Sequence, residues 1–76
     1  MVRIKALGVM RDLLGFKEKE IVIDKPRPLR EIIDAEKLSV LEPERIIILV
    51  NHQYANFDTI VKNEDYVAIL PVIGGG

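Results

Sequence analysis

The sequence predicts a two-layer α+β domain, in which a single main helix covers one face of a sheet. Three observations lead to this class. Several short segments alternate apolar and polar residues as strands do, one longer segment has apolar residues at helical spacing, and Gly and Pro separate them. The chain has 76 residues, which is enough for one small domain with a modest core.

The first strand is predicted over VRIKAL, residues 2–7, where apolar residues alternate with Arg3 and Lys5. Gly8 breaks this strand. A short helix follows in VMRDLLG, because its apolar residues have helical spacing and Gly15 occupies the usual position after a helix end.

A second strand is predicted at residues 17–24, and it ends at the segment DKPRP. The two prolines of this segment are expected to rule out strand pairing there. Pro28 suits the first turn of a helix, because its missing N–H would have no partner in that position. The main helix is therefore predicted from Leu29 to about Lys37, and it is the one long helix of the chain.

The strongest strand prediction is RIIILVN, residues 45–51. A turn then leads to a short return strand around Tyr54, and a last strand is expected at residues 66–70, ended by Pro71. Ile46–Val50 has no polar alternate positions. With one long helix available, we expect its outward residues to form an exposed apolar patch of the kind that marks partner surfaces. The alternative is cover by the loop at residues 38–41.

The composition excludes several classes of function. Eleven basic and 12 acidic residues give a net charge of -1, so no basic face for nucleic acid is expected. Cysteine is absent, which excludes disulfides, thiolate metal sites and a cysteine nucleophile. The longest apolar run is too short to span a membrane, and the first residues lack the apolar stretch of a signal peptide. We therefore expect a cytoplasmic protein.

Catalytic side chains are almost absent. His52 is the only histidine, and it lies in a predicted turn with no second ligand or nucleophile near it in the sequence. Asp24, Asp34 and Asp58 are scattered, so no carboxylate pair for acid–base chemistry is expected. The sequence predicts neither a metal site nor a catalyst that works on its own.

The glycine-rich end PVIGGG directly follows the last predicted strand. Glycines add little to a fold, but residues 72–76 would span ~17 Å when extended and could enter a channel too narrow for other residues. Pro71 stiffens the base of this tail. As a substrate, the Gly76 carboxylate would be activated with ATP and then captured by a sulfur donor or an amine. The alternative is an inert, frayed end. We divide the chain into a folded domain, residues 1–71, and a flexible tail, residues 72–76.

Both ends of the chain resemble the MoaD/ThiS sulfur carriers, which share the β-grasp fold of ubiquitin. The stretch VRIKALGVMRDLLG resembles the MoaD opening, a strand that runs into an A-x-x-R-E-L-x-G turn of helix. Arg11, Leu13 and Gly15 match this motif, whereas Gly8 and Asp12 stand where Ala and Glu are usual. LVN looks like the third strand and its turn, and NEDYVAILPVIGGG is similar to the MoaD ending DGDEVAxxPPVxGG.

The resemblance implies a mixed sheet of four to five strands in the order 2-1-5-3-4, with the first and last strands parallel at its centre and one main helix on one face. It implies that an E1-like enzyme adenylates Gly76 with ATP, and that a sulfur donor protein converts the product to a thiocarboxylate. The chain itself would bind no cofactor. In the MoaD branch it would be the small subunit of molybdopterin synthase, and its tail would supply sulfur for molybdopterin inside the large subunit's pocket.

The site residues implied by the resemblance are the tail and two apolar positions that precede it. The partner-binding set is Leu7, Leu70, Pro71, Val72, Ile73, Gly74 and Gly75, and Gly76 carries the reacting carboxylate. Val72 replaces the second proline of the MoaD ending, and Gly74 makes the GGG ending that is common in ThiS-like carriers for thiamine. The alternatives are such a ThiS-like carrier, a small archaeal or Urm1-like modifier conjugated to lysines, and a β-grasp binding module with an inert tail.

Overall fold

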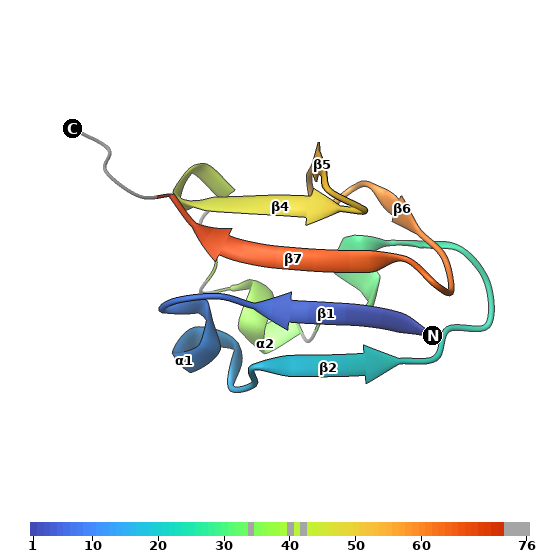
Figure 1. Ribbon diagram of the computed structural model, residues 1–76, viewed down its shortest axis with the longest axis horizontal. Coiled ribbons are helices and arrows are strands. Elements are labelled where there is room, and N and C mark those ends of the chain that lie inside the picture. The colour runs from blue at the N-terminus through green and yellow to red at the C-terminus, as the bar shows by residue number, and fades with distance from the viewer. Residues whose placement is uncertain (34, 40, 42, 73–76) are drawn as a thin grey trace.

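The computed structural model describes residues 1–33, 35–39, 41 and 43–72. The elements are, in chain order, β1 (Val2–Ala6), α1 (Met10–Leu14), β2 (Glu18–Ile21), β3 (Arg27–Pro28), the 3-10 turn η1 (Leu29–Glu31), α2 (Ala35–Leu38), the 3-10 turn η2 (Pro43–Arg45), β4 (Ile46–Val50), β5 (Gln53–Ala55), β6 (Ile60–Val61) and β7 (Tyr66–Pro71). One mixed sheet has the order β2-β1-β7-β4-β5, and a separate two-stranded ladder joins β3 to β6 (Figure 1).

The first and last strands of the chain are parallel neighbours at the centre of the sheet. Arg3 lies beside Tyr66 and Ala6 beside Ile69, while β4 pairs antiparallel with the other side of β7. Counted along the chain, the five strands of this sheet have the order 2-1-5-3-4, as the resemblance predicts. The α+β class and the β-grasp arrangement are therefore confirmed.

The core lies between the sheet and the helices, and α2 lies behind the sheet in the view of Figure 1. Strand residues that alternate along the chain point to this side, which is why every second residue of β1 is buried. The buried apolar residues are Val2, Ile4, Ala6, Met10, Leu14, Ile23, Leu29, Leu41, Ile46, Ile48, Val61, Val67 and Ile69. This set supplies the hydrophobic contribution to folding.

The predicted main helix over residues 29–37 is wrong, because the chain forms η1, breaks at Ile32 and only then forms α2. The Ile32 N–H donates to the Leu29 carbonyl, three residues back, at 3.0 Å, which closes a 3-10 turn. Ile32 and Ile33 are β-branched, and this lowers their helix propensity. The Leu29 N–H donates to the Thr59 carbonyl at 2.9 Å, so tertiary contacts hold η1 in place of a longer helix.

The expectation that the prolines of DKPRP exclude strand pairing is also wrong. Pro28 has extended angles, φ -60 and ψ 143, and lies opposite Ile60 in the β3–β6 ladder. The next residue, Leu29, donates its N–H to Thr59, so Pro28 falls at the alternate position, where an antiparallel ladder needs no N–H. A ladder this short can therefore include the proline.

Two predicted turns are confirmed. Gly15 follows α1 with φ 80, and its N–H donates to the Arg11 carbonyl at 2.9 Å, as expected of a glycine after a helix end. Asn51 and His52 form the turn between β4 and β5, with φ of 51 and 71. Positive φ at both central residues is the geometry of the tight hairpin turns that match strand twist.

The orientation of β4 decides between the two readings of its apolar run. Ile46 and Ile48 are buried in the core, whereas Ile47 and Leu49 are half-buried on the opposite face. Leu41, from the loop proposed as the alternative cover, packs in the core together with Ile46 and Ile48. The outward residues of β4 thus belong to an apolar surface on the face of the sheet away from the core.

Candidate functional site

The candidate site begins where β7 ends. Pro71 lies opposite Ile46, so the expectation that this proline ends the ladder is wrong. The Val72 N–H donates to the Arg45 carbonyl at 3.1 Å, so the adjacent nitrogen of Pro71 points away from β4 and costs the ladder no bond. On the other side, the Leu7 N–H donates to the β7 carbonyl of Ile69 at 3.0 Å. The sheet therefore holds the chain firmly as far as Val72.

Gly8 lies directly against this end of β7. Its φ is +56, and a Cβ built on it would lie 3.4 Å from the Cγ atom of Pro71. A side chain at this position would be strained by the backbone angle and would press on the proline ring. Gly8 thus allows the turn into α1 to pack closely against the base of the tail, and α1 and the end of β7 lie at the same end of the molecule (Figure 1).

The two predicted apolar contact residues lie side by side before the tail. Ala6 is beside Ile69 in the parallel ladder, and continuing this register places Leu7 beside Leu70. Ile47 lies opposite Leu70 on the other side, in β4. Leu7, Leu70 and Ile47 are all half-buried, so together they form an apolar row that crosses three strands.

The tail itself is described only at its first residue. Val72 is 46% exposed, although its backbone is bonded to the folded part of the chain. Ile73, Gly74, Gly75 and Gly76, the remaining members of the predicted set, lie outside the described residues. Their predicted roles are taken up below as proposals.

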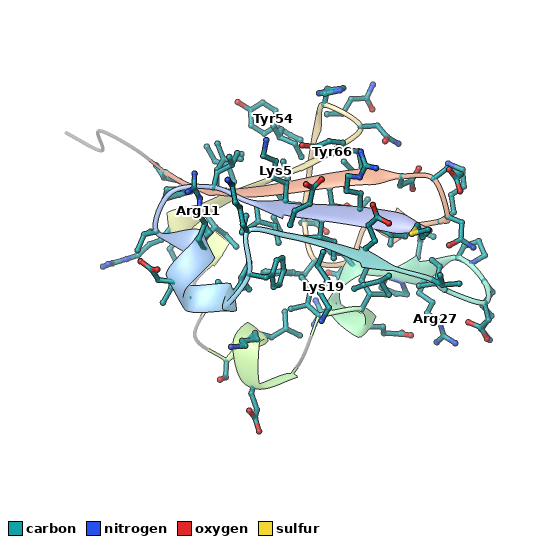
Figure 2. The ribbon with its side chains drawn as sticks, turned by 60° about the horizontal axis from the view of Figure 1, so that its bottom comes forward. Lys5, Arg11, Lys19, Arg27, Tyr54 and Tyr66 are labelled. Atoms are coloured by element: carbon teal, nitrogen blue, oxygen red, sulfur yellow. The ribbon has the colours of Figure 1, made fainter. Side chains whose placement is uncertain are left out.

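The face of the sheet away from the core, which we call the open face, has an apolar half and a charged half. The apolar half consists of Ile47, Leu49, Tyr54, Ala68 and Leu70, from β4, β5 and β7. The charged half consists of Arg3, Lys5, Glu18 and Glu20, from β1 and β2. In Figure 2, Lys5, Tyr54 and Tyr66 rise on the side of the sheet opposite α2.

Most of the open face was not predicted from the sequence. Tyr54 is 84% exposed and is the most exposed large apolar residue of the described chain, yet the sequence pattern marked it only as part of a short strand. Ala68 and Lys5 were likewise not singled out. The signal that could have found Ala68 is the alternation of the last strand, since Tyr66, Ala68 and Leu70 share one face.

The charged half is organised around Arg3. Its guanidinium lies 3.4 Å from the Glu18 carboxylate and 3.4 Å from the Glu20 carboxylate. All three side chains are about half exposed, so each pair contributes less than ~1 kcal/mol to stability. Arg3 thus forms an ion pair with each of the two glutamates of this half.

Sequence comparison gives the family of the chain. Residues 4–76 match the ThiS family, which is almost the whole length. The chain belongs to the ThiS family. It is a ubiquitin-like sulfur carrier of the ThiS/MoaD type, and such a carrier is not itself a catalyst. Among curated protein sequences there is no significant match.

Solved structures share the fold of this ThiS-family chain. A protein described as molybdopterin converting factor, subunit 1, from Pyrococcus furiosus is 25% identical with a TM-score of 0.73, covering 95% of this chain and 97% of that one. SAMP1 from Haloferax volcanii is 18% identical with a TM-score of 0.74, covering 99% and 98%. A BexX/CysO complex from Amycolatopsis orientalis contains a chain that is 24% identical, with a TM-score of 0.68 and full coverage of both chains. The last two likenesses show the fold alone.

The opposite end of β7 in this ThiS-family chain holds its only buried charged side chain among the described residues. Asp65 accepts hydrogen bonds from the Asn51 amide at 2.9 Å, the Lys62 N–H at 2.9 Å and the Lys62 ammonium at 3.2 Å. Burial raises the pKa of Asp65, but the bonds from Asn51 and Lys62 together outweigh it and hold this pKa below its ordinary value. This network joins the turn before β7 to the turn after β4, and it is structural.

The described part of this ThiS-family chain contains neither a metal-binding cluster nor a membrane-spanning helix. No group of three or more His, Asp or Glu side chains in residues 1–33, 35–39, 41 and 43–72 could hold a metal ion. Within the same ranges, no helix has the length and apolarity needed to cross a membrane.

Proposed function

We propose that this chain carries sulfur on its C-terminal glycine and donates it to molybdopterin synthesis, as the small subunit of molybdopterin synthase. The observation that carries the proposal is the central position of β7, which holds the chain up to Val72, next to the apolar open face. The likeness to the Pyrococcus furiosus converting factor supports the molybdopterin branch. The cytoplasm is the proposed location.

The proposed chemistry starts at the Gly76 carboxylate. One of its oxygens attacks the α-phosphorus of ATP, the bond to pyrophosphate breaks, and an acyl-adenylate forms. Hydrosulfide released by the sulfur donor protein then attacks the acyl carbon, so that a C–S bond forms and the C–O bond to AMP breaks. The thiol proton is lost to solvent and no net electron transfer occurs, which leaves a thiocarboxylate. ATP is bound by the activating enzyme, and this chain needs no cofactor of its own.

Glycines suit this role because they lack Cβ atoms, so the backbone can enter a narrow channel and approach a bound nucleotide closely. Pro71 limits the freedom of the chain at the base of the tail, which reduces the entropy lost on docking. Gly74, Gly75 and Gly76 are proposed to occupy the channel, with Ile73 and Val72 at its mouth.

The proposed partners are an E1-like adenylating enzyme, a sulfur donor protein and the large subunit of molybdopterin synthase. Leu7, Leu70 and Ile47 form a row beside the base of the tail, so a partner that covers this row also lies where it can receive the tail. The CysO likeness supports a partner protein, because that CysO is in complex with BexX.

A second candidate is a protein modifier, favoured by the structural likeness to SAMP1. In that reading the amine of a target lysine attacks the same acyl-adenylate, an isopeptide bond forms and AMP leaves. A ThiS-like carrier for thiamine differs only in the recipient of the sulfur. A binding module with an inert tail would use the open face alone.

The test combines the intact mass of the protein from its native cells with a search for its glycines on lysine side chains. We expect a species in which sulfur replaces one oxygen of the Gly76 carboxylate, and molybdopterin formation when this species is mixed with the large subunit and the precursor. Deleting Gly75 and Gly76 should abolish both without changing the melting temperature, and Gly75→Val should leave the fold intact and block adenylation.

Three outcomes would contradict the proposal. Branched lysine peptides without the sulfur species would make the chain a modifier. A sulfur species that supports thiazole but not molybdopterin formation would place it in the thiamine branch. Full partner function after deletion of Gly75 and Gly76 would make it a binding module.

A further inference from the structure

The strand β2 forms one edge of the five-stranded sheet, and in the described part of the chain no strand pairs with its outer side (Figure 1). The Ala6 N–H donates to the Lys17 carbonyl at 3.0 Å, which shows that the backbone groups of Lys17 point towards β1. In an antiparallel ladder this orientation alternates along the strand, so the backbone groups of Glu18 and Glu20 point outward. β2 therefore presents an edge to which a further strand can be added.

An apolar groove runs beside this edge, on the side of the sheet that faces α2. Two hollows, of about 420 and about 40 Å³, share Ile21 of β2 and Ile32 in their linings. Phe16 and Ile33 add to the apolar lining of the smaller hollow. All four side chains are half-buried and so remain partly accessible. Because every second side chain of an added strand points to this side, the groove can receive an apolar side chain next to Ile21.

Two ammonium groups flank the smaller hollow, those of Lys19 and Lys37. The Lys37 Nζ atom would lie 3.3 Å from a Cβ atom built on Gly15, and the Lys19 Nζ atom lies 5.8 Å from the centroid of the Phe16 ring. In Figure 2, Lys19 lies on the side of β2 nearer to α2. The two cations therefore converge on the short segment between α1 and β2.

The smaller hollow lacks a matching anion, since no acidic side chain of the described residues lines it. Glu18 and Glu20 point to the open face, where each pairs with Arg3. Glu36 is exposed and precedes Lys37 in α2, and adjacent helix residues do not face each other. Among the ion pairs of residues 1–33, 35–39, 41 and 43–72, none involves either lysine of this hollow. A carboxylate is thus the complementary ligand here.

We propose that the β2 edge binds an extended peptide of a partner protein, which adds a strand to the sheet and places an apolar side chain beside Ile21 and a carboxylate between Lys19 and Lys37. The backbone bonds supply affinity, and the alternate side chains supply specificity. Antiparallel pairing is the more stable arrangement per residue, so the apolar residue of the peptide precedes the acidic one by two positions.

The surrounding charges define the rest of this peptide. In the larger hollow, Arg27 already pairs with both Asp24 and Glu31, so the acidic residue belongs at the lysine end of the groove. Residues opposite Glu18 and Glu20 are uncharged, because like charges directly opposite destabilise a sheet. The site lies on the other side of the sheet from the open face, and it does not depend on the proposed function.

The experiment titrates the synthetic peptide Val-Thr-Ile-Thr-Glu-Thr, acetylated and amidated, into the isotope-labelled full chain at about 50 mM NaCl. In the proposed register, its Ile lies beside Ile21, its Glu beside Lys19 and its middle Thr opposite Glu20. Amide chemical shifts give both the Kd and the location of binding. Melting temperatures check that each protein variant folds.

The backbone pairing is tested on the peptide alone, so that the protein stays unchanged. N-methylation of the middle Thr removes an N–H that points to β2, whereas N-methylation of the Ile removes one that points to solvent. We expect the first to raise the Kd on the order of 10-fold and the second to change it little. Equal effects of the two modifications would overturn strand addition.

The role of the two lysines is tested with Lys19→Gln/Lys37→Gln. The matched control is Lys5→Gln/Lys25→Gln, which changes the net charge equally but lies outside the linings of both hollows. The first double variant should raise the Kd about 5-fold and the control should not. A peptide with Gln in place of Glu should bind wild type about 5-fold more weakly, and the Lys19→Gln/Lys37→Gln protein should not distinguish the two peptides.

Four results would overturn the inference and leave the carrier function standing. These are no binding up to about 1 mM peptide, shift changes confined to the open face, and equal Kd values for the two double variants. The fourth is a dimer of the chain alone, with shift changes of the β2 amides on dilution, which would assign this edge to a second copy.

Discussion

Replacing Asp65 by alanine should cost this small domain a large part of its stability. The Asp65 side chain is 7% exposed and accepts bonds from the Asn51 amide, the Lys62 N–H and the Lys62 ammonium. Asn51 in turn accepts the Tyr66 N–H at 2.9 Å through its side-chain oxygen, so the carboxylate positions a residue that bonds the first residue of β7. The alanine variant would remove the acceptor and leave the donors in place.

The expected loss is about 3 kcal/mol. The Asn51 amide and the Lys62 N–H are part-buried, and each buried donor left without an acceptor costs about 1–3 kcal/mol. The Lys62 ammonium is 69% exposed and returns to water at little cost. A domain of this length has a total stability of about 4–11 kcal/mol, so the loss is a large fraction of it.

The pH dependence follows from the lowered pKa of Asp65. Because the folded-state pKa lies below the ordinary value of 3.8, the contribution of the carboxylate is fully present above that value and is lost as the pH falls through the folded pKa. Wild type should therefore lose this stability at acid pH, whereas Asp65→Ala lacks it at every pH. The difference between the two proteins should shrink as the pH falls below 3.8.

Urea unfolding followed by far-ultraviolet circular dichroism measures this difference. With a slope of about 1 kcal/mol per molar urea, the midpoint at neutral pH should fall by about 3 M. Asp58→Ala is the control, because Asp58 is 76% exposed and its ion pair with Arg30 should contribute less than ~1 kcal/mol. A midpoint shift for Asp65→Ala no larger than that of Asp58→Ala, or one that persists unchanged at acid pH, would refute the reasoning.

Three further changes test other parts of the structure. Glu64 has φ 79 and stands where the MoaD ending has glycine. Because glycine adopts this angle without strain, Glu64→Gly should stabilise the fold by about 1 kcal/mol and raise the melting temperature by about 5 °C. A lower melting temperature would contradict this. Gly8→Val should lower the free energy of unfolding by about 2 kcal/mol in urea titrations. The reason is that Gly8 has φ +56 and that a Cβ at this position would lie 3.4 Å from the Pro71 Cγ atom. An unchanged unfolding midpoint would show that the turn relaxes freely. Leu70 lies on the open face. In an assay of adenylation by the activating enzyme, Leu70→Asp should raise the KM for the carrier on the order of 10-fold, with a nearly unchanged melting temperature. An unchanged KM would show that Leu70 is not part of the docking surface.

Local patterns were sufficient for the five strands of the main sheet and for the class of the fold, but not for the β3–β6 ladder. The alternation around Ile4 and the apolar run at Ile46–Val50 predicted β1 and β4, and Gly15 predicted the end of α1. The same kind of pattern failed for residues 29–37, because apolar residues at helical spacing say nothing of the bond from the Leu29 N–H to Thr59 or of the break at Ile32. Whether these residues form one long helix or a 3-10 turn is decided by contacts with a segment far along the chain.

The candidate site was predicted only in part, because its surface also depends on contacts between segments that are far apart in the sequence. The sequence marked the glycine tail, Leu7 and Leu70, and the structure places these two leucines next to each other at the base of the tail. The location of Tyr54 and Lys5 in one row was not predictable, since it depends on the register of four strands and on which face each one presents.

The sequence by itself predicted the class of the fold, and it showed a glycine-rich segment after the last strand, no cysteine, and the motifs of a MoaD/ThiS carrier. Only the tertiary structure decided which side chains share the open face and that Arg3 lies there between Glu18 and Glu20. Asp65 likewise became a buried anchor only through the pairing of β7 with its neighbours. The physical reason is that side-chain chemistry and strand period are local properties of the chain, whereas burial and ion pairing depend on the distances between segments that folding brings together.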